Sequence, residues 1–216
     1  MSSAPGPPIP RRDLGLPALA AAAFVLFAVV LSLFQLYAAG VRPVGLFYQR
    51  GFHLALVQVL AFLLFPTKGR GERGVKGRLA WTLDAIFIAG SAFAALYLTL
   101  NLDAIVSRAG AWNSLDVVAG IVGVVTLFEA SRRALGWPIC LIAALFIGYA
   151  YAGPFLPGLL RHRGYGTGRL VGQLYLGQEG IYGIPLGVAA SFVFVFILFG
   201  ALLEVTGAGQ FFIDLA

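Results

Sequence analysis

The side chains that could bind a metal ion or act as nucleophiles are few in this sequence and far apart. It contains two histidines, His53 and His162, and one cysteine, Cys140, which lies inside an apolar run. No His-Glu-x-x-His motif is present, and these residues do not follow metal-ligand spacing. Ser91 and Ser191 lack the Gly-x-Ser-x context of an intramembrane serine protease. We therefore expect no catalytic residues, no metal site and no enzyme activity, and we expect Cys140 to face lipid or another helix.

Ionisable residues inside the apolar runs are the other candidates for chemistry, because a charge placed in lipid is costly. Arg50 either reaches the membrane surface with its long stem or belongs to a transport pathway. His53 either packs with its polar atoms satisfied or carries protons. Glu129 precedes Arg132 and Arg133 by three and four residues, which is the spacing of helical ion pairs.

Three carboxylates lie near the ends of apolar runs. Asp84 falls near the predicted cytoplasmic end of its run. Asp116 opens a run, where the positive end of a helix favours a carboxylate. Glu204 closes the last run, and it is either an interfacial carboxylate at a helix end or a contact for a mobile domain.

The composition predicts a membrane protein. Sixty per cent of the 216 residues are apolar, whereas 15 are Lys or Arg and 9 are Asp or Glu. A soluble domain carries about 25% charged residues. The net charge of +6 does not indicate nucleic-acid binding, because the basic residues lie in short loops between apolar runs.

Six apolar runs are long enough to cross a bilayer as helices, which needs roughly 20 residues for a core of about 30 Å. The first run has 23 residues, longer than the roughly 7–15 of a signal peptide. We therefore predict an all-α polytopic membrane protein with about six transmembrane helices, preceded by a disordered cytoplasmic lead (residues 1–16). The predicted spans are Pro17–Ala39, Val44–Phe65, Leu79–Leu100, Leu115–Ala130, Ala134–Ala152 and Ile184–Val205.

The Lys and Arg residues of the loops predict the orientation, because cytoplasmic loops are enriched in them. The loop after the second span is the most basic, and alternation of the spans then places the N-terminus and the end of the sixth span in the cytoplasm. Nine basic residues fall inside, namely Arg11, Arg12, Lys68, Arg70, Arg73, Lys76, Arg78, Arg132 and Arg133. Six fall outside, namely Arg42, Arg50, Arg108, Arg161, Arg163 and Arg169.

The segment between the fifth and sixth spans is too polar to cross a bilayer. From Thr167, a candidate helix cap, apolar residues recur at helical spacing as far as Tyr182. This pattern predicts one interfacial amphipathic helix on the outer membrane surface. The alternative is a glycine-rich loop packed on the protein.

Four blocks of sequence resemble one family. They are LFEASRRALG (residues 127–136), GPFLPGLLRHRGYGTGRLVGQLYLGQEGIYGIPLGV (153–188), FVFVFILFGALLE (192–204) and TGAGQFFIDLA (206–216). Together they are similar to the fused permeases of tripartite ATP-independent periplasmic (TRAP) transporters, most of all to the TAXI-type branch. The blocks are specific from about Leu127 onward, and before that residue the likeness is one of architecture.

The resemblance implies a domain organisation. Residues 17–133 correspond to a four-span small subunit, 134–160 to a connecting helix, and 161–216 to the start of a large transport subunit. The helices that hold substrate and sodium in that family would follow Ala216, so we expect a fragment or one product of a split gene. The matched motif positions carry no ligand role and are Gly183, Pro185, Gly187, Gly200, Glu204, Gly207, Gly209 and Asp214.

The resemblance also implies a function. The expectation is a permease component of a sodium-coupled secondary transporter in the bacterial inner membrane, which takes up a small organic anion, expected to be a carboxylate. The implied partners are the remainder of the large subunit, a periplasmic solute-binding protein and membrane lipid, without nucleic acid. Sodium is implied for the complete transporter, and dicarboxylates, amino acids and sugar acids remain open as substrates. The alternative function is a non-transporting membrane scaffold or assembly subunit.

Overall fold

The protein is an all-α polytopic membrane protein. The computed structural model describes residues 18–42, 44–69, 74–108, 110–209 and 211. Within these residues there is no strand, and six helices are long and apolar enough to cross a membrane, as the sequence predicts. The predicted disordered lead (residues 1–16) and Asp214 lie outside the described residues.

Each of the first four spans is one α-helix, the fifth combines α6 with a 3-10 turn, and the sixth combines three consecutive segments. The helices are α1 (Ala18–Gly40), α2 (Leu46–Leu64), α3 (Val75–Leu100), α4 (Leu102–Ser107), α5 (Ser114–Leu135), α6 (Trp137–Ala152), α7 (Thr167–Val171), α8 (Ile184–Val188) and α9 (Phe194–Thr206). The narrow 3-10 turns η1 (Gly153–Phe155) and η2 (Gly158–Leu160) follow α6. The wider π-type turns η3 (Gly172–Leu176) and η4 (Ala189–Val193) continue α7 and join α8 to α9.

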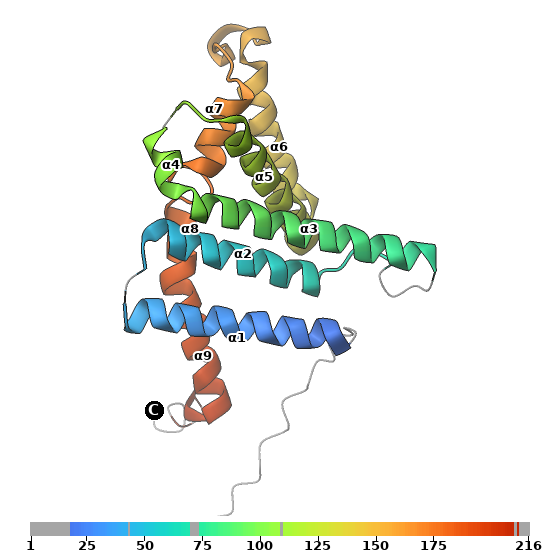
Figure 1. Ribbon diagram of the computed structural model, residues 1–216, viewed down its shortest axis with the longest axis vertical. Coiled ribbons are helices and arrows are strands. Elements are labelled where there is room, and N and C mark those ends of the chain that lie inside the picture. The colour runs from blue at the N-terminus through green and yellow to red at the C-terminus, as the bar shows by residue number, and fades with distance from the viewer. Residues whose placement is uncertain (1–17, 43, 70–73, 109, 210, 212–216) are drawn as a thin grey trace, which may run out of the picture.

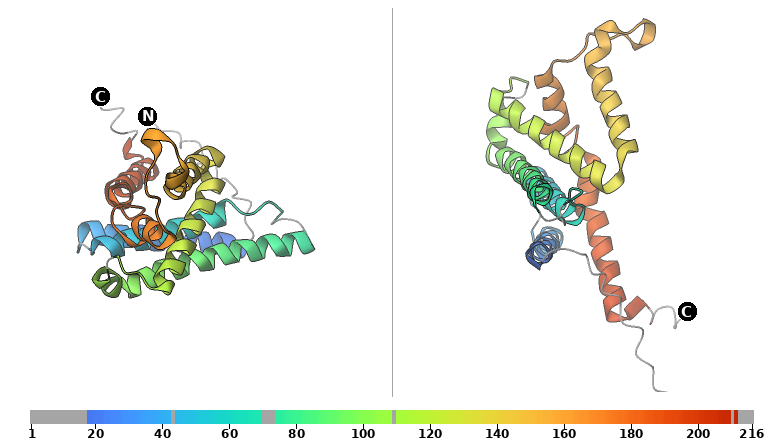
Figure 2. Two further views of the ribbon diagram at one scale, coloured as in Figure 1. Left: turned by 90° about the horizontal axis from the view of Figure 1, so that it is seen from above. Right: turned by 90° about the vertical axis from the view of Figure 1, so that its right-hand side faces the viewer.

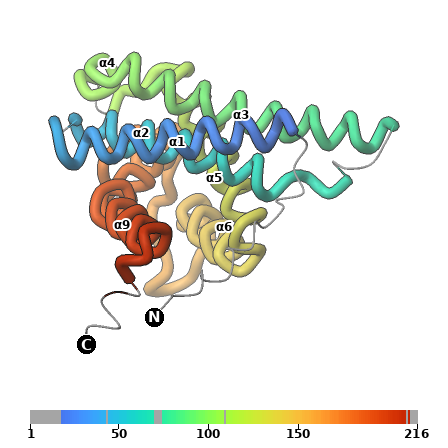
Figure 3. Tube along the Cα trace, turned by 90° about the horizontal axis from the view of Figure 1, so that it is seen from below, coloured from blue at the N-terminus to red at the C-terminus, as the bar shows by residue number. Residues whose placement is uncertain are grey.

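Three spans form a layer that the last span crosses. α1, α2 and α3 lie side by side in chain order, and α5 packs against both α2 and α3 (Figure 1). α8, η4 and α9 form a continuous rod that runs across α2 and α1 and extends past α1 (Figures 1 and 2). Seen from below, α6 and α9 lie on the same side of the layer (Figure 3).

The start and end of α5 follow from individual residues. The Asn113 side chain accepts a hydrogen bond from the Asp116 backbone N–H at 2.7 Å, and the Asp116 carboxylate accepts one from the Asn113 N–H at 2.9 Å. This reciprocal cap satisfies N–H groups that no helical carbonyl reaches, and it confirms the prediction that Asp116 opens the fourth span. At the other end, Gly136 has φ +88°, which favours glycine, and Pro138 follows in the first turn of α6.

The largest buried cluster in the described residues joins α2, α3, α4 and the segment before the sixth span. Its members are Leu54, Ala94, Leu98, Ile105, Tyr175, Leu176 and Tyr182. A Cβ atom added at Gly120 or Gly123 of α5 would overlap the side chains of Val171 or Tyr175. These two glycines therefore let α7 and η3 approach the backbone of α5 closely.

The predicted amphipathic helix is present from Thr167, and its apolar side faces the protein. Val171, Tyr175 and Leu176 are buried against α5 and its neighbours. The predicted cap at Thr167 is wrong, because Gly166 holds the cap position and no side chain caps the helix. Thr167 is instead the first helical residue, and its hydroxyl accepts a 3.2 Å hydrogen bond from Tyr151.

Candidate functional site

Charged and polar side chains of α1 and α2 meet the sixth span where it crosses them. Arg50, in the second turn of α2, donates a hydrogen bond from Nη1 to the backbone carbonyl of Tyr182, just before α8. Its guanidinium lies against Gly187, where an added Cβ would be 2.6 Å from Nη2. The small residue at Gly187 therefore makes room for the arginine.

Two glutamines and a histidine extend this polar contact. Gln35 of α1 and His53 of α2 are joined by a 2.6 Å hydrogen bond between Nε2 and Nδ1, and both are buried. The Gln49 amide donates to the Gln35 side-chain oxygen and to the backbone carbonyl of Ala190, each at 3.4 Å. The His53 ring also packs edge-on against Phe194 at the start of α9, with centroids 5.8 Å apart. We call Gln35, Gln49, Arg50 and His53 the polar junction.

The irregular backbone of the sixth span explains how the polar junction reaches it. Ala190 lies in the π-type turn η4, and wide turns of this kind loosen the regular hydrogen-bond ladder. The Ala190 carbonyl thus accepts a bond from Gln49, and the Ser191 hydroxyl donates to the Gly187 carbonyl at 2.7 Å. In a membrane, irregular backbone requires side-chain or water partners, and α2 supplies one.

Tyr182 anchors the other side of the junction. Its ring is fully buried and packs against Tyr175 with centroids 5.2 Å apart and against Phe47 with centroids 5.9 Å apart. Burial raises the pKa of the Tyr182 phenol well above its ordinary value, so this group stays neutral beside the charged Arg50. The buried ring thereby fixes the carbonyl that Arg50 contacts.

The motif positions of the sixth span separate into two groups. Gly183, Pro185 and Gly187 lie at its beginning, next to the polar junction, and Pro185 occupies the first turn of α8. Gly200, Glu204, Gly207 and Gly209 lie in or after α9, where the rod extends past α1 (Figure 1). No atom lies within 4 Å of a Cβ added at Gly200 or Gly207 in the described residues.

Sequence reasoning found Arg50 and His53 but missed their partners. The sequence leaves open whether Arg50 reaches the membrane surface or belongs to a transport pathway, and the structure adds that its guanidinium contacts the Tyr182 carbonyl and Gly187. Gln35 and Gln49 were not selected, although an amide inside a long apolar run is itself a signal. His53 is hydrogen-bonded and packed, which matches the simpler of its two interpretations.

Two further ionic groups tie helix ends together. Arg133, whose side chain is 7% exposed, bonds Asp84 at 2.6 Å and Glu129 at 2.7 Å, and Arg132 bonds Glu129 at 2.8 Å. The predicted pairing of Glu129 with both arginines is confirmed. Asp84 also accepts bonds from the backbone and hydroxyl of Thr67, so it joins the α2–α3 loop to α5.

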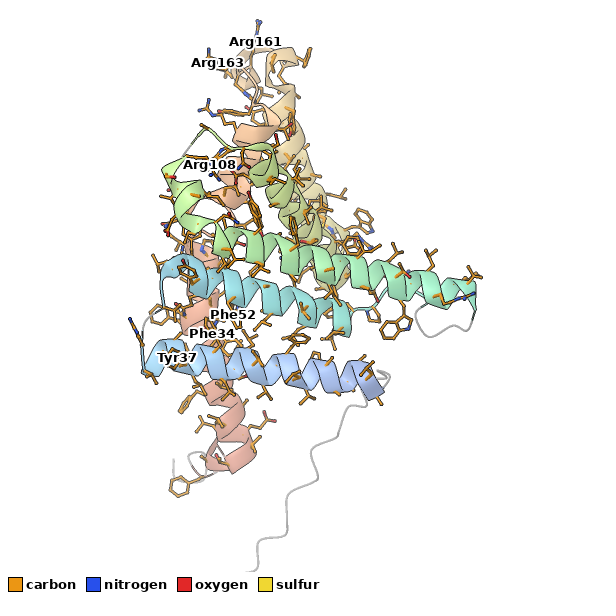
Figure 4. All side chains as sticks on the ribbon, viewed as in Figure 1. Phe34, Tyr37, Phe52, Arg108, Arg161 and Arg163 are labelled. Carbon is orange, nitrogen blue, oxygen red and sulfur yellow. The ribbon has the colours of Figure 1, made fainter. Side chains whose placement is uncertain are left out.

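The second ionic group lies at the beginning of α5. The buried Asp116 accepts hydrogen bonds from the Tyr97 hydroxyl at 2.8 Å and from Arg108 at 3.0 Å. Arg108 lies toward the same end of the molecule as Arg161 and Arg163 (Figure 4). Because each carboxylate here is already paired, we assign these groups to structure.

The described residues hold no group of three His, Cys, Asp or Glu side chains that could bind a metal ion. Cys140 is buried and its sulfur lies 3.6 Å from the Phe128 carbonyl, so it faces a helix. No family model matches this chain, and neither curated proteins nor solved structures provide a match.

Proposed function

We propose that this protein is a permease component of a TRAP-type secondary transporter in the bacterial inner membrane. In this proposal, α1 to α5 form a membrane-fixed scaffold, and the sixth span begins a large subunit whose moving part rocks or slides against that scaffold. The complete assembly would take up a small organic anion with sodium, delivered by a periplasmic solute-binding protein. Glu204 and the glycines around it would contact the moving part.

One observation carries the proposal, namely the polar junction against an irregular helix. Arg50, His53, Gln35 and Gln49 converge on α8 and η4 within a bundle of apolar helices. Ionisable residues inside a membrane mark transport pathways or the elements that serve them. Interrupted helices paired with polar groups are a recurring device of secondary transporters.

The exposed surface of the sixth span gives further support. Within the sixth span, Ile184–Thr206, only 6% of the residues in the most apolar 18-residue window are buried inside the protein. Phe196, Ile197, Phe199 and Val205 are each more than half exposed. Such a span is covered by lipid or by further helices, as expected of the opening helix of a larger subunit.

Recovery of the partners from native membranes tests the proposal. The affinity-tagged chain is purified and its companions are identified by mass spectrometry. We expect a multi-span permease polypeptide or a solute-binding protein in stoichiometric amount. Absence of both, together with no downstream coding sequence for further apolar spans, would contradict the proposal.

Sodium-driven uptake with matched variants tests the role of the polar junction. Gln49 and Gln58 are both glutamines of α2, but Gln49 contacts Ala190 of the sixth span whereas Gln58 bonds Ser91 of α3 at 2.7 Å. In cells that hold the complete assembly, we expect Gln49→Leu to reduce uptake per molecule several-fold and Gln58→Leu to reduce mainly the amount of protein. Equal uptake per molecule for both variants would refute the assignment.

The proposed orientation is tested by labelling with a maleimide that cannot cross membranes. Lys68 lies in the α2–α3 loop and Arg163 lies between α6 and α7, and both are exposed. In a Cys140→Ala background, we expect Arg163→Cys to be labelled in intact cells and Lys68→Cys only after lysis. The reverse pattern would invert the proposed topology.

The alternative, a scaffold or assembly subunit without transport activity, fits the same α1–α5 arrangement. A transport assay on vesicles that contain this polypeptide alone separates the two functions. Uptake by the polypeptide alone would exclude a pure scaffold.

A further inference from the structure

Arg50 carries a charge that no carboxylate neutralises in the described part of the chain. Its guanidinium donates to the neutral Tyr182 carbonyl, and its Nε atom is buried without a hydrogen-bond partner. The half-buried Arg108 and the buried Arg133 each have a carboxylate within 3.0 Å. Because an unpaired charge in a spanning helix is costly, Arg50 calls for an anionic partner.

A groove opens beside this guanidinium. It has a volume of about 220 Å³, and residues of the first turns of α2 and of the sixth span line it, Gly187 among them. One water needs about 10–15 Å³ of such volume, so the groove accommodates a much larger group. Arg50 supplies the charge and Ser191 a hydroxyl, while most of the remaining walls are apolar.

The apolar wall forms a strip that starts at the arginine. Ile184, Val188 and Phe192 follow one another at intervals of four residues, which places them on one side of the helix. Their exposed fractions are 78%, 42% and 66%. Leu46 of α2, also exposed, faces this strip across the groove. A hydrocarbon chain would lie along the strip.

Arg50 and Gly187 both lie near the beginning of their helices. Arg50 is four residues after the start of α2, and Gly187 is three residues after the start of α8. At about 1.5 Å per residue, both lie within about 6 Å of the helix start. The guanidinium therefore lies near one end of α2, and the end of a spanning helix is where lipid phosphates meet the hydrocarbon core.

We propose that the groove beside Arg50 binds one anionic phospholipid, with its phosphate on the guanidinium and an acyl chain along Ile184, Val188 and Phe192. Arginine binds phosphate oxygens through parallel hydrogen bonds, so the guanidinium suits the phosphate of a lipid head group. The bound lipid links α2 to the sixth span. This inference does not depend on the proposed transport function, since it concerns lipid binding by the chain itself.

Native mass spectrometry of the detergent-purified chain tests the site. The protein is titrated with phosphatidylglycerol, with phosphatidylcholine and with inorganic phosphate. We expect one tightly bound phosphatidylglycerol and at least tenfold weaker binding of phosphatidylcholine. Equal affinity for the two lipids, or displacement of the lipid by millimolar inorganic phosphate, would overturn the proposal.

Two pairs of variants locate the binding. Arg50→Gln removes the guanidinium, and its control is Arg42→Gln, which removes an exposed arginine from the loop just before α2. Gly187→Leu keeps the charge but displaces the guanidinium and occupies the groove, and its control is Gly200→Leu, at a position with no atom within 4 Å of an added Cβ.

We expect Arg50→Gln and Gly187→Leu each to weaken phosphatidylglycerol binding at least tenfold, and each control to change it less than twofold. If Arg50→Gln does not fold, phosphatidylglycerol binding by Gly187→Leu and by its control tests the site. Retention of the lipid by Gly187→Leu, or by a folded Arg50→Gln, refutes the site.

Discussion

The ion pair between Arg133 and Asp84 gives the sharpest test of what holds the helices together. The two adjacent arginines at the end of α5 both bond Glu129, but Arg133 is 7% exposed and also bonds Asp84, whereas Arg132 is 34% exposed. The Arg133 guanidinium lies over the rings of Phe62 and Phe87, at 5.0 and 5.3 Å from their centroids. Arg133→Gln and Arg132→Gln are therefore matched variants in different environments.

The expected magnitudes follow from burial. Removing one partner of a buried ion pair costs about 3–5 kcal/mol, because the other charge stays buried without compensation. Asp84 is 1% exposed but keeps its hydrogen bonds from Thr67, so we expect Arg133→Gln to lower the free energy of unfolding by about 3 kcal/mol. Arg132→Gln removes a more exposed pair and should cost about 0–1 kcal/mol.

Reversible unfolding in mixed detergent micelles, followed by tryptophan fluorescence, measures both values. A double-mutant cycle with Asp84→Asn isolates the pair, and we expect a coupling energy of about 1–3 kcal/mol. If Arg133→Gln and Arg132→Gln differ by less than about 0.5 kcal/mol, the assignment of Arg133 to the buried network is wrong.

Two further substitutions test the packing around α5. A methyl group at Gly123 would overlap the buried ring of Tyr175, so Gly123→Ala should destabilise the protein by about 1–3 kcal/mol, whereas Gly200→Ala should be neutral in the same unfolding assay. Equal effects would show that α7 and η3 do not pack tightly on α5. Tyr97→Phe removes one hydrogen bond to the buried Asp116 and should cost about 1.5–3 kcal/mol. A change below about 0.5 kcal/mol would mean that the remaining bonds of Asp116 satisfy it fully.

Much of the fold could be predicted because each membrane-spanning helix is encoded by a continuous stretch of apolar residues. A helix in lipid must satisfy its own backbone hydrogen bonds over about 20 apolar residues, so each span is encoded by its own run of sequence. For this reason the predicted span Val44–Phe65 lies within two residues of the observed α2, Leu46–Leu64, at each end. The position of Asp116 at the beginning of α5 could also be predicted, because the positive end of a helix favours a carboxylate. The pairing of Glu129 with Arg132 and Arg133 could be predicted from spacings of three and four residues within one helix.

The long-range contacts could not be predicted in this way. Arg50 and Tyr182 are 132 residues apart, and Arg133 and Asp84 are 49 apart. Apolar runs carry little information about which face meets which helix, since lipid and protein are equally apolar partners. The close approach of Tyr175 to Gly123 could not be predicted either, because a glycine in a span indicates close packing but not which residue packs against it.

The sequence by itself determined the class of the protein, the number of its spans and the ionic contacts within single helices. Hydropathy acts within one run of about 20 residues, and ion-pair spacing acts within one or two turns of one helix. Only the tertiary structure decided that the sixth span crosses α1 and α2 and that its wide turn meets Gln49. It also decided that Arg50 faces Gly187 without a carboxylate partner among the described residues. The physical reason is that such contacts depend on the angle and rotation of whole helices, which the packing of every neighbouring side chain sets together.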